Sequence, residues 1–184
     1  MEPPHKESFG DYEVFISEVF RWKTPPAIEE AKDTLHISKK GKEVYYAESA
    51  HFWIGDMEDL KNPSRIKIGD DITDDGVPDL VISDWGSDGY GYLTYTVFSL
   101  GEELKVLGKM NAKQDSKGSF KDLDGDGVPE FLGNDFSLLK KATTGVFYED
   151  ALAKAPELIY QFKNGGYQPA ASLMKETKHT ESSK

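Results

Sequence analysis

The chain has 184 residues and a mass of 20.6 kDa, enough for one domain with a sizeable hydrophobic core. Its 33 acidic and 22 basic side chains give a formal net charge of -11, which disfavours binding to nucleic acid or to anionic membranes. Because 38% of the residues are hydrophobic and 12% aromatic, the chain is not a disordered acidic tail. Cysteine is absent, which excludes disulfides, thiolate metal sites and cysteine nucleophiles.

Both ends of the chain are polar. Residues 1–10 carry two prolines and residues 176–184 carry no apolar side chain, so both are expected to be disordered tails around a single β-rich domain at 11–175. No apolar run approaches the roughly 18 residues of a membrane span. The first residues also lack the apolar core of a signal peptide. The chain is therefore expected to be either cytoplasmic or a mature form without its leader.

Strand patterns dominate the predicted domain. Strands are expected at 12–22, around Leu35 and Ile37, and at 44–46, 65–68, 80–82, 92–98, 104–106 and 158–162. Turns are expected at 39–42 and 101–102, and Asn164-Gly165 is a strong hairpin signal. The apolar run 80–82 is typical of a strand buried on both faces. Short helices are expected at 26–31, 149–155 and 170–176, so the fold class is all-β with minor helices.

One acidic segment occurs twice in the chain. Asp71-Ile72-Thr73-Asp74-Asp75-Gly76-Val77-Pro78-Asp79 recurs as Asp122-Leu123-Asp124-Gly125-Asp126-Gly127-Val128-Pro129-Glu130. An apolar strand pattern follows each copy, and the glycines Gly76 and Gly127 are 51 residues apart. This spacing predicts two repeated supersecondary units, at about 65–115 and 116–165.

The spacing of the acids predicts calcium sites, because Ca²⁺ takes six to eight oxygen ligands. Such a loop supplies side-chain oxygens at positions 1, 3, 5 and 9 and a backbone carbonyl at position 7, and the glycine at position 6 permits the sharp turn. In the first loop these ligands are Asp71, Thr73, Asp75, the Val77 carbonyl and Asp79; in the second they are Asp122, Asp124, Asp126, the Val128 carbonyl and Glu130. Up to two ions are expected. The second loop should bind more tightly, because Thr73 replaces a carboxylate.

Two other interpretations of the loops fit the sequence less well. An EF-hand needs an acid at position 12 and flanking helices, but position 12 is Ile82 or Gly133 and strand residues follow position 9. A single copy of such a segment is most often a solvated turn, in which Asp and Gly are common. The shared glycine, valine and proline of the two copies favour the metal site over that interpretation.

The loops resemble the FG-GAP/VCBS class of repeats, in which integrin-type propellers carry a calcium loop between the strands of a blade. The wider layout resembles small bacterial exported proteins of unknown function. It is carried by Asp33-Thr34-Leu35-His36-Ile37, Phe98-Ser99-Leu100-Gly101 and Leu158-Ile159-Tyr160-Gln161-Phe162 as well as by the loops. This resemblance implies a propeller-like fold, bound calcium and export, to the periplasm or the extracellular space, but no reaction. Because a closed propeller needs about four blades or more, we expect an incomplete one of two or three antiparallel sheets.

Other catalytic patterns are weak. The four histidines show no zinc-binding spacing, and neither a nucleophile elbow nor a P-loop occurs. The segment Trp85–Tyr92 would suit sugar or peptide stacking, but a core position for Trp85 is favoured. The sequence therefore predicts a non-catalytic, exported calcium-binding module that acts as a binding or scaffold protein, with a protein or polysaccharide partner. The alternative is a hydrolase of extracellular polymers with acidic loop residues at its active site.

Overall fold

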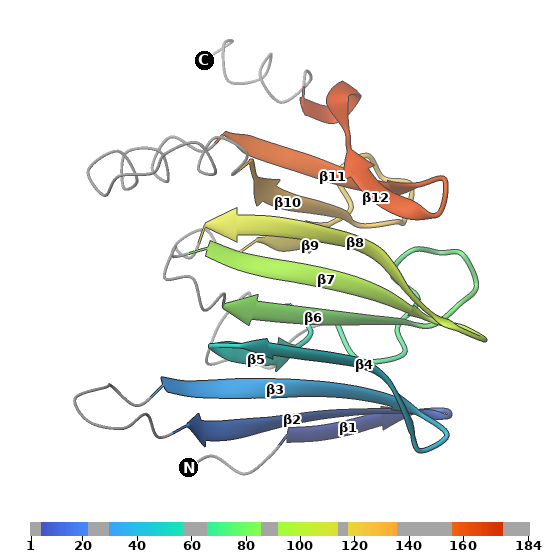
Figure 1. Ribbon diagram of the computed structural model, residues 1–184. Helices are drawn as coiled ribbons and strands as arrows, with labels where there is room; N and C mark the ends of the chain where they lie inside the picture. The colour runs from blue at the N-terminus through green and yellow to red at the C-terminus, as the bar shows by residue number, and fades with distance from the viewer. Residues whose placement is uncertain are drawn as a thin grey trace, which may run out of the picture.

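The computed structural model describes residues 5–21, 30–56, 66–85, 92–113, 118–135 and 156–174. Within them, twelve strands form three antiparallel sheets of four strands each, stacked one above another (Figure 1). Neighbouring strands in every sheet are consecutive in the chain, and none of the sheets closes into a barrel. The predicted all-β fold with incomplete propeller-like sheets is therefore confirmed.

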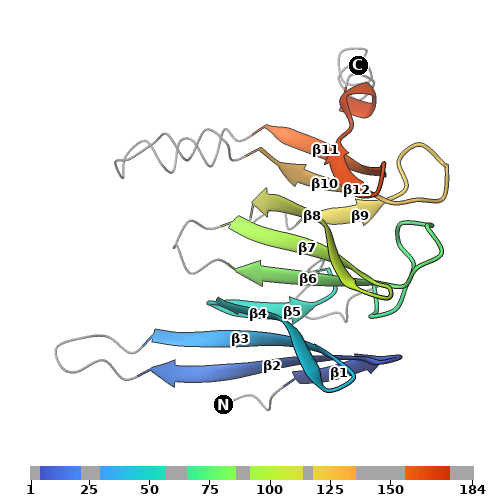
Figure 2. The ribbon, with the colours of Figure 1, turned by 45° about the vertical axis from the view of Figure 1, so that its right-hand side comes forward.

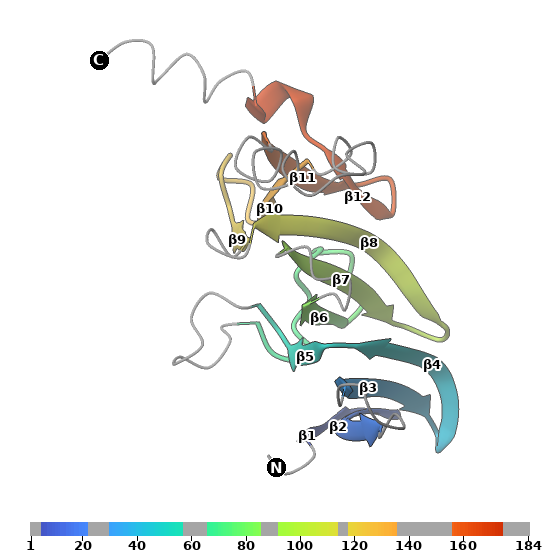
Figure 3. The same cartoon turned by 60° about the vertical axis from the view of Figure 1, so that its left-hand side comes forward.

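The first sheet contains β1 (His5–Phe9), β2 (Tyr12–Arg21), β3 (Glu30–Lys39) and β4 (Lys42–Ser49). The second sheet contains β5 (His51–Ile54), β6 (Asp79–Trp85), β7 (Tyr92–Leu100) and β8 (Leu104–Lys113). The third sheet contains β9 (Ser119–Lys121), β10 (Glu130–Asn134), β11 (Glu157–Lys163) and β12 (Gly166–Pro169). β4 curves from the first sheet towards the second, where β5 begins (Figure 3). One helical turn, residues 171–174, follows the last strand, and no helix among the described residues is long and apolar enough to cross a membrane.

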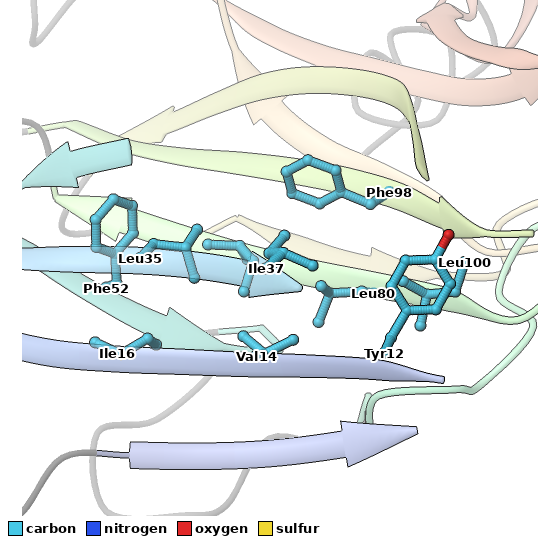
Figure 4. Packing of buried hydrophobic residues seen from close by; sticks show 10 residues of the cluster. Tyr12, Val14, Ile16, Leu35, Ile37, Phe52, Leu80, Phe98 and Leu100 are labelled. Atoms are coloured by element: carbon cyan, nitrogen blue, oxygen red, sulfur yellow. The ribbon is translucent and has the colours of Figure 1, made fainter. Parts of the chain in front are cut away.

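The second sheet is buried on both faces. Alternate residues of β2 and β3 point from the first sheet onto one face of the second and form a continuous apolar layer with it (Figure 4). The fully buried members of this layer from the two sheets are Val14, Leu35, Ile37, Leu80, Ile82 and Phe98. On β6, Leu80 and Ile82 belong to this core while Val81 belongs to the core on the opposite face, which confirms the prediction for the run 80–82.

The core between the second and third sheets is aromatic. The Phe131 ring lies 4.8 Å from the Tyr95 ring and 5.0 Å from the Phe120 ring, measured between centroids. Leu93 and Val97 pack in the same cluster from β7. The face of Leu93, Tyr95 and Val97 that the alternation predicted is thus the face against the third sheet.

A polar clamp joins the first two sheets at their turn end. The Tyr12 hydroxyl donates a hydrogen bond of 2.9 Å to the carbonyl of Gly101, in the turn between β7 and β8. The Lys39 ammonium donates to the carbonyls of Gly101, at 2.8 Å, and Glu102, and lies 4.9 Å from the centroid of the Tyr12 ring. The turn that the clamp holds lies beside the first acidic loop. A Cβ added at Gly101 would lie 3.3 Å from the Val77 side chain.

The prediction of a disordered tail at 1–10 is wrong for His5–Phe9, which form β1 and pair along their whole length with β2. Gly10, at φ 56°, lets the chain reverse in two residues, so even this polar segment reaches the ladder of β2. The predicted strand at 65–68 is also wrong over its described residues 66–68, because none of them is in a strand and residues 68 and 69 form a turn. The Asp70 carboxylate holds this turn by accepting a 2.7 Å hydrogen bond from the Lys67 N–H.

The helix predictions have mixed outcomes. The segment 170–176 is helical at 171–174, whereas Glu30 and Ala31 of the predicted helix 26–31 belong to β3. The rest of that segment, the predicted helix 149–155 and the predicted tail 176–184 lie outside the described residues. The hairpin at Asn164-Gly165 is confirmed, and both residues have the positive φ angles, 55° and 78°, of a type I′ turn.

We expect Gly133→Ala to destabilise the protein by about 1–3 kcal/mol, the usual cost of overpacking a core. A Cβ at Gly133 on β10 would overlap the carbonyl oxygen of Asn111 on β8 and lie 2.6 Å from the Phe131 ring. Urea unfolding measures the loss, with the exposed Lys109→Ala on β8 as the control. An unchanged midpoint would contradict this close approach of the second and third sheets.

Candidate metal centre

The two acidic loops occupy equivalent places in the fold. Each precedes the second strand of its sheet, since the first leads into β6 and the second joins β9 to β10. Both project from the same side of the stacked sheets (Figure 2). The sequence repeat therefore corresponds to a repeated position in two neighbouring sheets.

In the second loop, three predicted ligands converge. One carboxylate oxygen each from Asp122, Asp124 and Glu130 lies within 4.8 Å of the others. Two oxygens bound to the same Ca²⁺ at about 2.4 Å can be at most about 4.8 Å apart. The spacing of the three carboxylates therefore fits one ion held among them.

Backbone donors shape this loop around its acids. The Asp122 carboxylate accepts hydrogen bonds from the N–H groups of Gly125, at 2.7 Å, and Gly127, at 3.1 Å. Both glycines have positive φ angles, 82° and 93°, which side chains disfavour. At the end of the loop, Glu130 accepts a 2.8 Å hydrogen bond from the Leu123 N–H. The ninth-position acid thus binds back to the start of the loop and closes it.

The first loop repeats this framework. The Gly76 N–H donates to Asp71 at 2.9 Å, as Gly127 does to Asp122. The Ile72 N–H donates to Asp79 at 3.1 Å, as Leu123 does to Glu130. The two loops therefore share a hydrogen-bonding pattern as well as a sequence pattern.

Thr73 takes the place of a carboxylate in the first loop. Its buried hydroxyl donates a 3.0 Å hydrogen bond to Asp79 and lies 3.4 Å from an oxygen of Asp71. Positions 1, 3 and 9 therefore converge in this loop too, with a neutral oxygen at position 3. An ion here would meet one negative charge fewer than in the second loop.

The fifth and seventh positions behave alike in the two loops. Asp75 accepts a 2.9 Å hydrogen bond from the Val77 N–H, and Asp126 accepts one of 2.8 Å from the Val128 N–H. Asp126 is not part of the group of three converging carboxylates. In each loop the fifth-position aspartate therefore holds the backbone of the seventh residue by a hydrogen bond.

Asp79 carries charge into the interior, since its side chain begins β6 at 1% exposure. Its Oδ1 atom has no hydrogen-bond partner among the described residues. Burial raises the pKa of the Asp79 carboxyl to about 7; hydrogen bonds from Thr73 oppose the rise, and the charges of Asp75 and Asp71 add to it. Burial likewise raises the pKa of Glu130. A cation in either loop would stabilise the ionised form of these acids.

The Phe9 side chain supports the first loop, and this role was not predicted from the sequence. Its ring packs directly on Gly69, at φ 94°, where a Cβ would overlap it. A hydrogen bond of 2.7 Å from the Leu100 N–H to the Pro78 carbonyl holds the other end of the loop. The available signal was the aromatic Phe9 placed just before Gly10-Asp11 and the aromatic strand that starts at Tyr12.

The structure favours the core position of Trp85 over a stacking platform. Trp85 and Trp53 are partly buried and pack against the core between the second and third sheets. The His51 ring lies 5.8 Å from the Trp53 ring and 6.2 Å from the Trp85 ring. The glycine-rich residues 86–91 lie outside the described residues.

Comparisons of the chain with protein-family models, with curated proteins and with solved structures find no match. The interpretation of the loops therefore depends on their own geometry. That geometry consists of converging oxygens, matched backbone donors and a buried acid in each loop.

We expect the stability of the calcium-free protein to fall as the pH rises from about 4 to about 7. The pKa of Asp79 is higher in the folded than in the unfolded chain. The protonated Asp79 carboxyl therefore contributes fully to the free energy of unfolding below about pH 4, and this contribution is lost as the folded carboxyl ionises towards pH 7. Asp79→Asn should flatten this slope, because an amide does not ionise. Urea unfolding in chelator at several pH values measures the effect.

The exposed Asp74→Asn serves as the control and should leave the slope unchanged. Glu130 keeps a smaller slope of the same sign in every variant, because its pKa is also raised. Equal slopes for the wild type and Asp79→Asn would contradict the burial of an uncompensated carboxyl at this position.

Proposed function

We propose that this protein is a non-catalytic calcium-binding module whose acidic loops are fastened to the ends of two β-sheets by the ion. The observation that carries the proposal is the convergence of Asp122, Asp124 and Glu130 within 4.8 Å. The first two are exposed and the third is buried, so an ion arriving from solvent would join the surface of the loop to the start of β10.

The chemistry of the ligands favours calcium. Every predicted ligand offers oxygen, from a side chain or, at Val77 and Val128, from the backbone carbonyl, and carboxylates predominate, which suits a hard cation. Backbone N–H groups donate hydrogen bonds to the carboxylates of Asp122 and Glu130, so the loop has its shape before an ion binds. Mg²⁺ should bind less well, since it needs shorter bonds and a near-ideal octahedron.

The first loop is proposed as a second, weaker site. Asp71, Thr73 and Asp79 approach one another as the equivalent residues of the second loop do. The buried Asp79 Oδ1 atom, without a partner among the described residues, is an oxygen that a cation would satisfy. The neutral Thr73 hydroxyl lowers the charge available to the ion, so this loop should fill at higher calcium concentration.

The proposed role is that of an exported binding or scaffold protein with a protein or polysaccharide partner. Loops of modest ligand charge suit the millimolar calcium outside the cytoplasm. The resemblance of the loops to FG-GAP/VCBS repeats is part of this proposal. No observation specifically supports the alternative of a hydrolase, because this proposal assigns the converging carboxylates as ligands of one ion.

We expect calcium to stabilise the wild type by about 2.7 kcal/mol at a hundredfold excess over its Kd, since it binds the folded chain. Asp124→Asn should remove most of this gain and Asp75→Asn a smaller part. In each variant the amide oxygen can still accept the backbone hydrogen bond that the carboxylate accepts now. The donor is the Asp126 N–H for position 124 and the Val77 N–H for position 75. Thermal melting in chelator and in excess Ca²⁺ or Mg²⁺ measures the effect.

The exposed turn residue Glu103 provides the matched control, because Glu103→Ala removes a negative charge outside the loops. The melting temperature of Glu103→Ala should rise with calcium as much as that of the wild type. A wild-type melting temperature that ignores both chelator and calcium would return the loops to ordinary acidic turns.

A further inference from the structure

The tip of the β1–β2 hairpin, residues 9–12, contacts the surroundings of the first acidic loop at two points. Phe9 and Tyr12 are paired across the turn and therefore lie on the same side of the first sheet. The Phe9 ring packs on Gly69, just before the loop, where a Cβ would overlap the ring. The Tyr12 hydroxyl donates a 2.9 Å hydrogen bond to the carbonyl of Gly101, which lies beside Val77. One cross-strand pair thus reaches both sides of the loop.

Backbone hydrogen bonds connect both contacts to the last residues of the loop. The Gly69 N–H donates to the Asp79 carbonyl at 2.8 Å, and the Asp79 N–H donates to the Asp70 carbonyl at 3.0 Å. On the other side, the Leu100 N–H donates to the Pro78 carbonyl at 2.7 Å. A continuous set of contacts therefore runs from the hairpin tip to positions 8 and 9 of the loop.

The strand β1 depends on the same contact. It lies at the edge of the first sheet, and four of its five residues are exposed. The Lys6 ammonium forms an exposed ion pair of 2.7 Å with Glu13, a kind of contact that stabilises little. A strand with few buried contacts opens easily. The packing of Phe9 on Gly69 therefore holds β1 as well as the start of the loop.

We propose that the tip of the β1–β2 hairpin sets the shape of the first acidic loop and, through that shape, its calcium affinity. The effect on calcium rests on the proposed function, whereas the control of the loop shape does not. An ion in this loop needs the Val77 carbonyl and the Asp79 carboxylate at fixed positions, and supporting contacts hold such ligands in place. The second loop joins β9 to β10 within the third sheet and should not respond.

Hydrogen exchange in chelator, read by NMR, tests the control of the loop shape, because the two loops contain matched amides. The Ile72 and Leu123 N–H groups each donate to the ninth-position acid of their loop. The Gly76 and Gly127 N–H groups each donate to the first-position acid. Phe9→Ala should speed exchange of the first-loop amides at least about fivefold more than that of the second-loop amides. Equal acceleration in both loops, or none in either, would overturn the inference.

Two further variants separate the contact from the stability of the hairpin. Phe9→Tyr keeps the ring on Gly69 and should keep wild-type exchange, because the Phe9 side chain is exposed enough for a hydroxyl to reach water. Phe15→Ala removes another partly exposed ring from β2, 6.2 Å from the His36 ring, and should leave the ratio between the loops unchanged. Preferential acceleration of the first loop by Phe15→Ala, equal to that by Phe9→Ala, would contradict a specific role of the tip.

The calcium test uses chains in which one loop has lost its first-position charge. In Asp122→Asn, where the first loop remains, Phe9→Ala should lower calcium affinity about fivefold or more by calorimetric titration. In Asp71→Asn, where the second loop remains, the same change should alter affinity less than about twofold, as expected for independent sites. An equal loss in both chains would overturn the inference, since it would indicate a general loosening of the fold.

The coupling should also act in the opposite direction, because coupling between two sites is reciprocal. Calcium should slow the hydrogen exchange of β1 in Asp122→Asn more than in Asp71→Asn. Absence of calcium binding in the wild type would refute the proposed function, and the exchange measurements in chelator would still decide the control of the loop shape. Calcium binding by the first loop that Phe9→Ala leaves unchanged would refute this inference alone.

Discussion

A buried carboxylate begins a central strand in each of two sheets, and the rest of the loop structure depends on it. Asp79 opens β6 at 1% exposure and Glu130 opens β10 at 3%. An ionised group in such a place is costly unless donors or a cation surround it. Each loop supplies the donors by folding back, so that the N–H of its second residue reaches the acid of its ninth. The position of the loop thus follows from the burial of the strand that comes after it.

The difference between the loops lies in how that negative charge is compensated. In the first, the Thr73 hydroxyl donates to Asp79 and removes part of the need for a cation. In the second, Asp124 adds another negative charge beside Asp122 and Glu130. Carboxylates this close repel one another, so the second loop gains more from an ion than the first. The same backbone framework therefore holds two acidic loops of different charge, which differ in how much a bound cation would stabilise them.

The sequence predicted the elements whose signals are local. The apolar run 80–82, the turn at Asn164-Gly165 and the nine-residue loops each carry their pattern within a few residues. It failed at His5–Phe9, because the pairing of a polar strand depends on its partner β2 and not on its own composition. The first loop was predicted as one unit, yet its neighbours Phe9 and Gly101 come from distant parts of the chain.

The outer face of the first sheet explains how a propeller-like stack can end after three sheets. Phe15, His36 and Tyr46 lie side by side across β2, β3 and β4, with ring centroids 6.2 Å and 5.0 Å apart. Polar bonds interrupt this aromatic row, since His36 bonds Glu43 at 2.6 Å and the Tyr46 hydroxyl donates to Glu48 at 2.6 Å. A face of this mixed kind tolerates water, whereas the opposite face of the same sheet carries the apolar core. The stack therefore buries both faces of its middle sheet. That burial draws Asp79 into the interior, where Ile72 and Thr73 donate hydrogen bonds to its carboxylate.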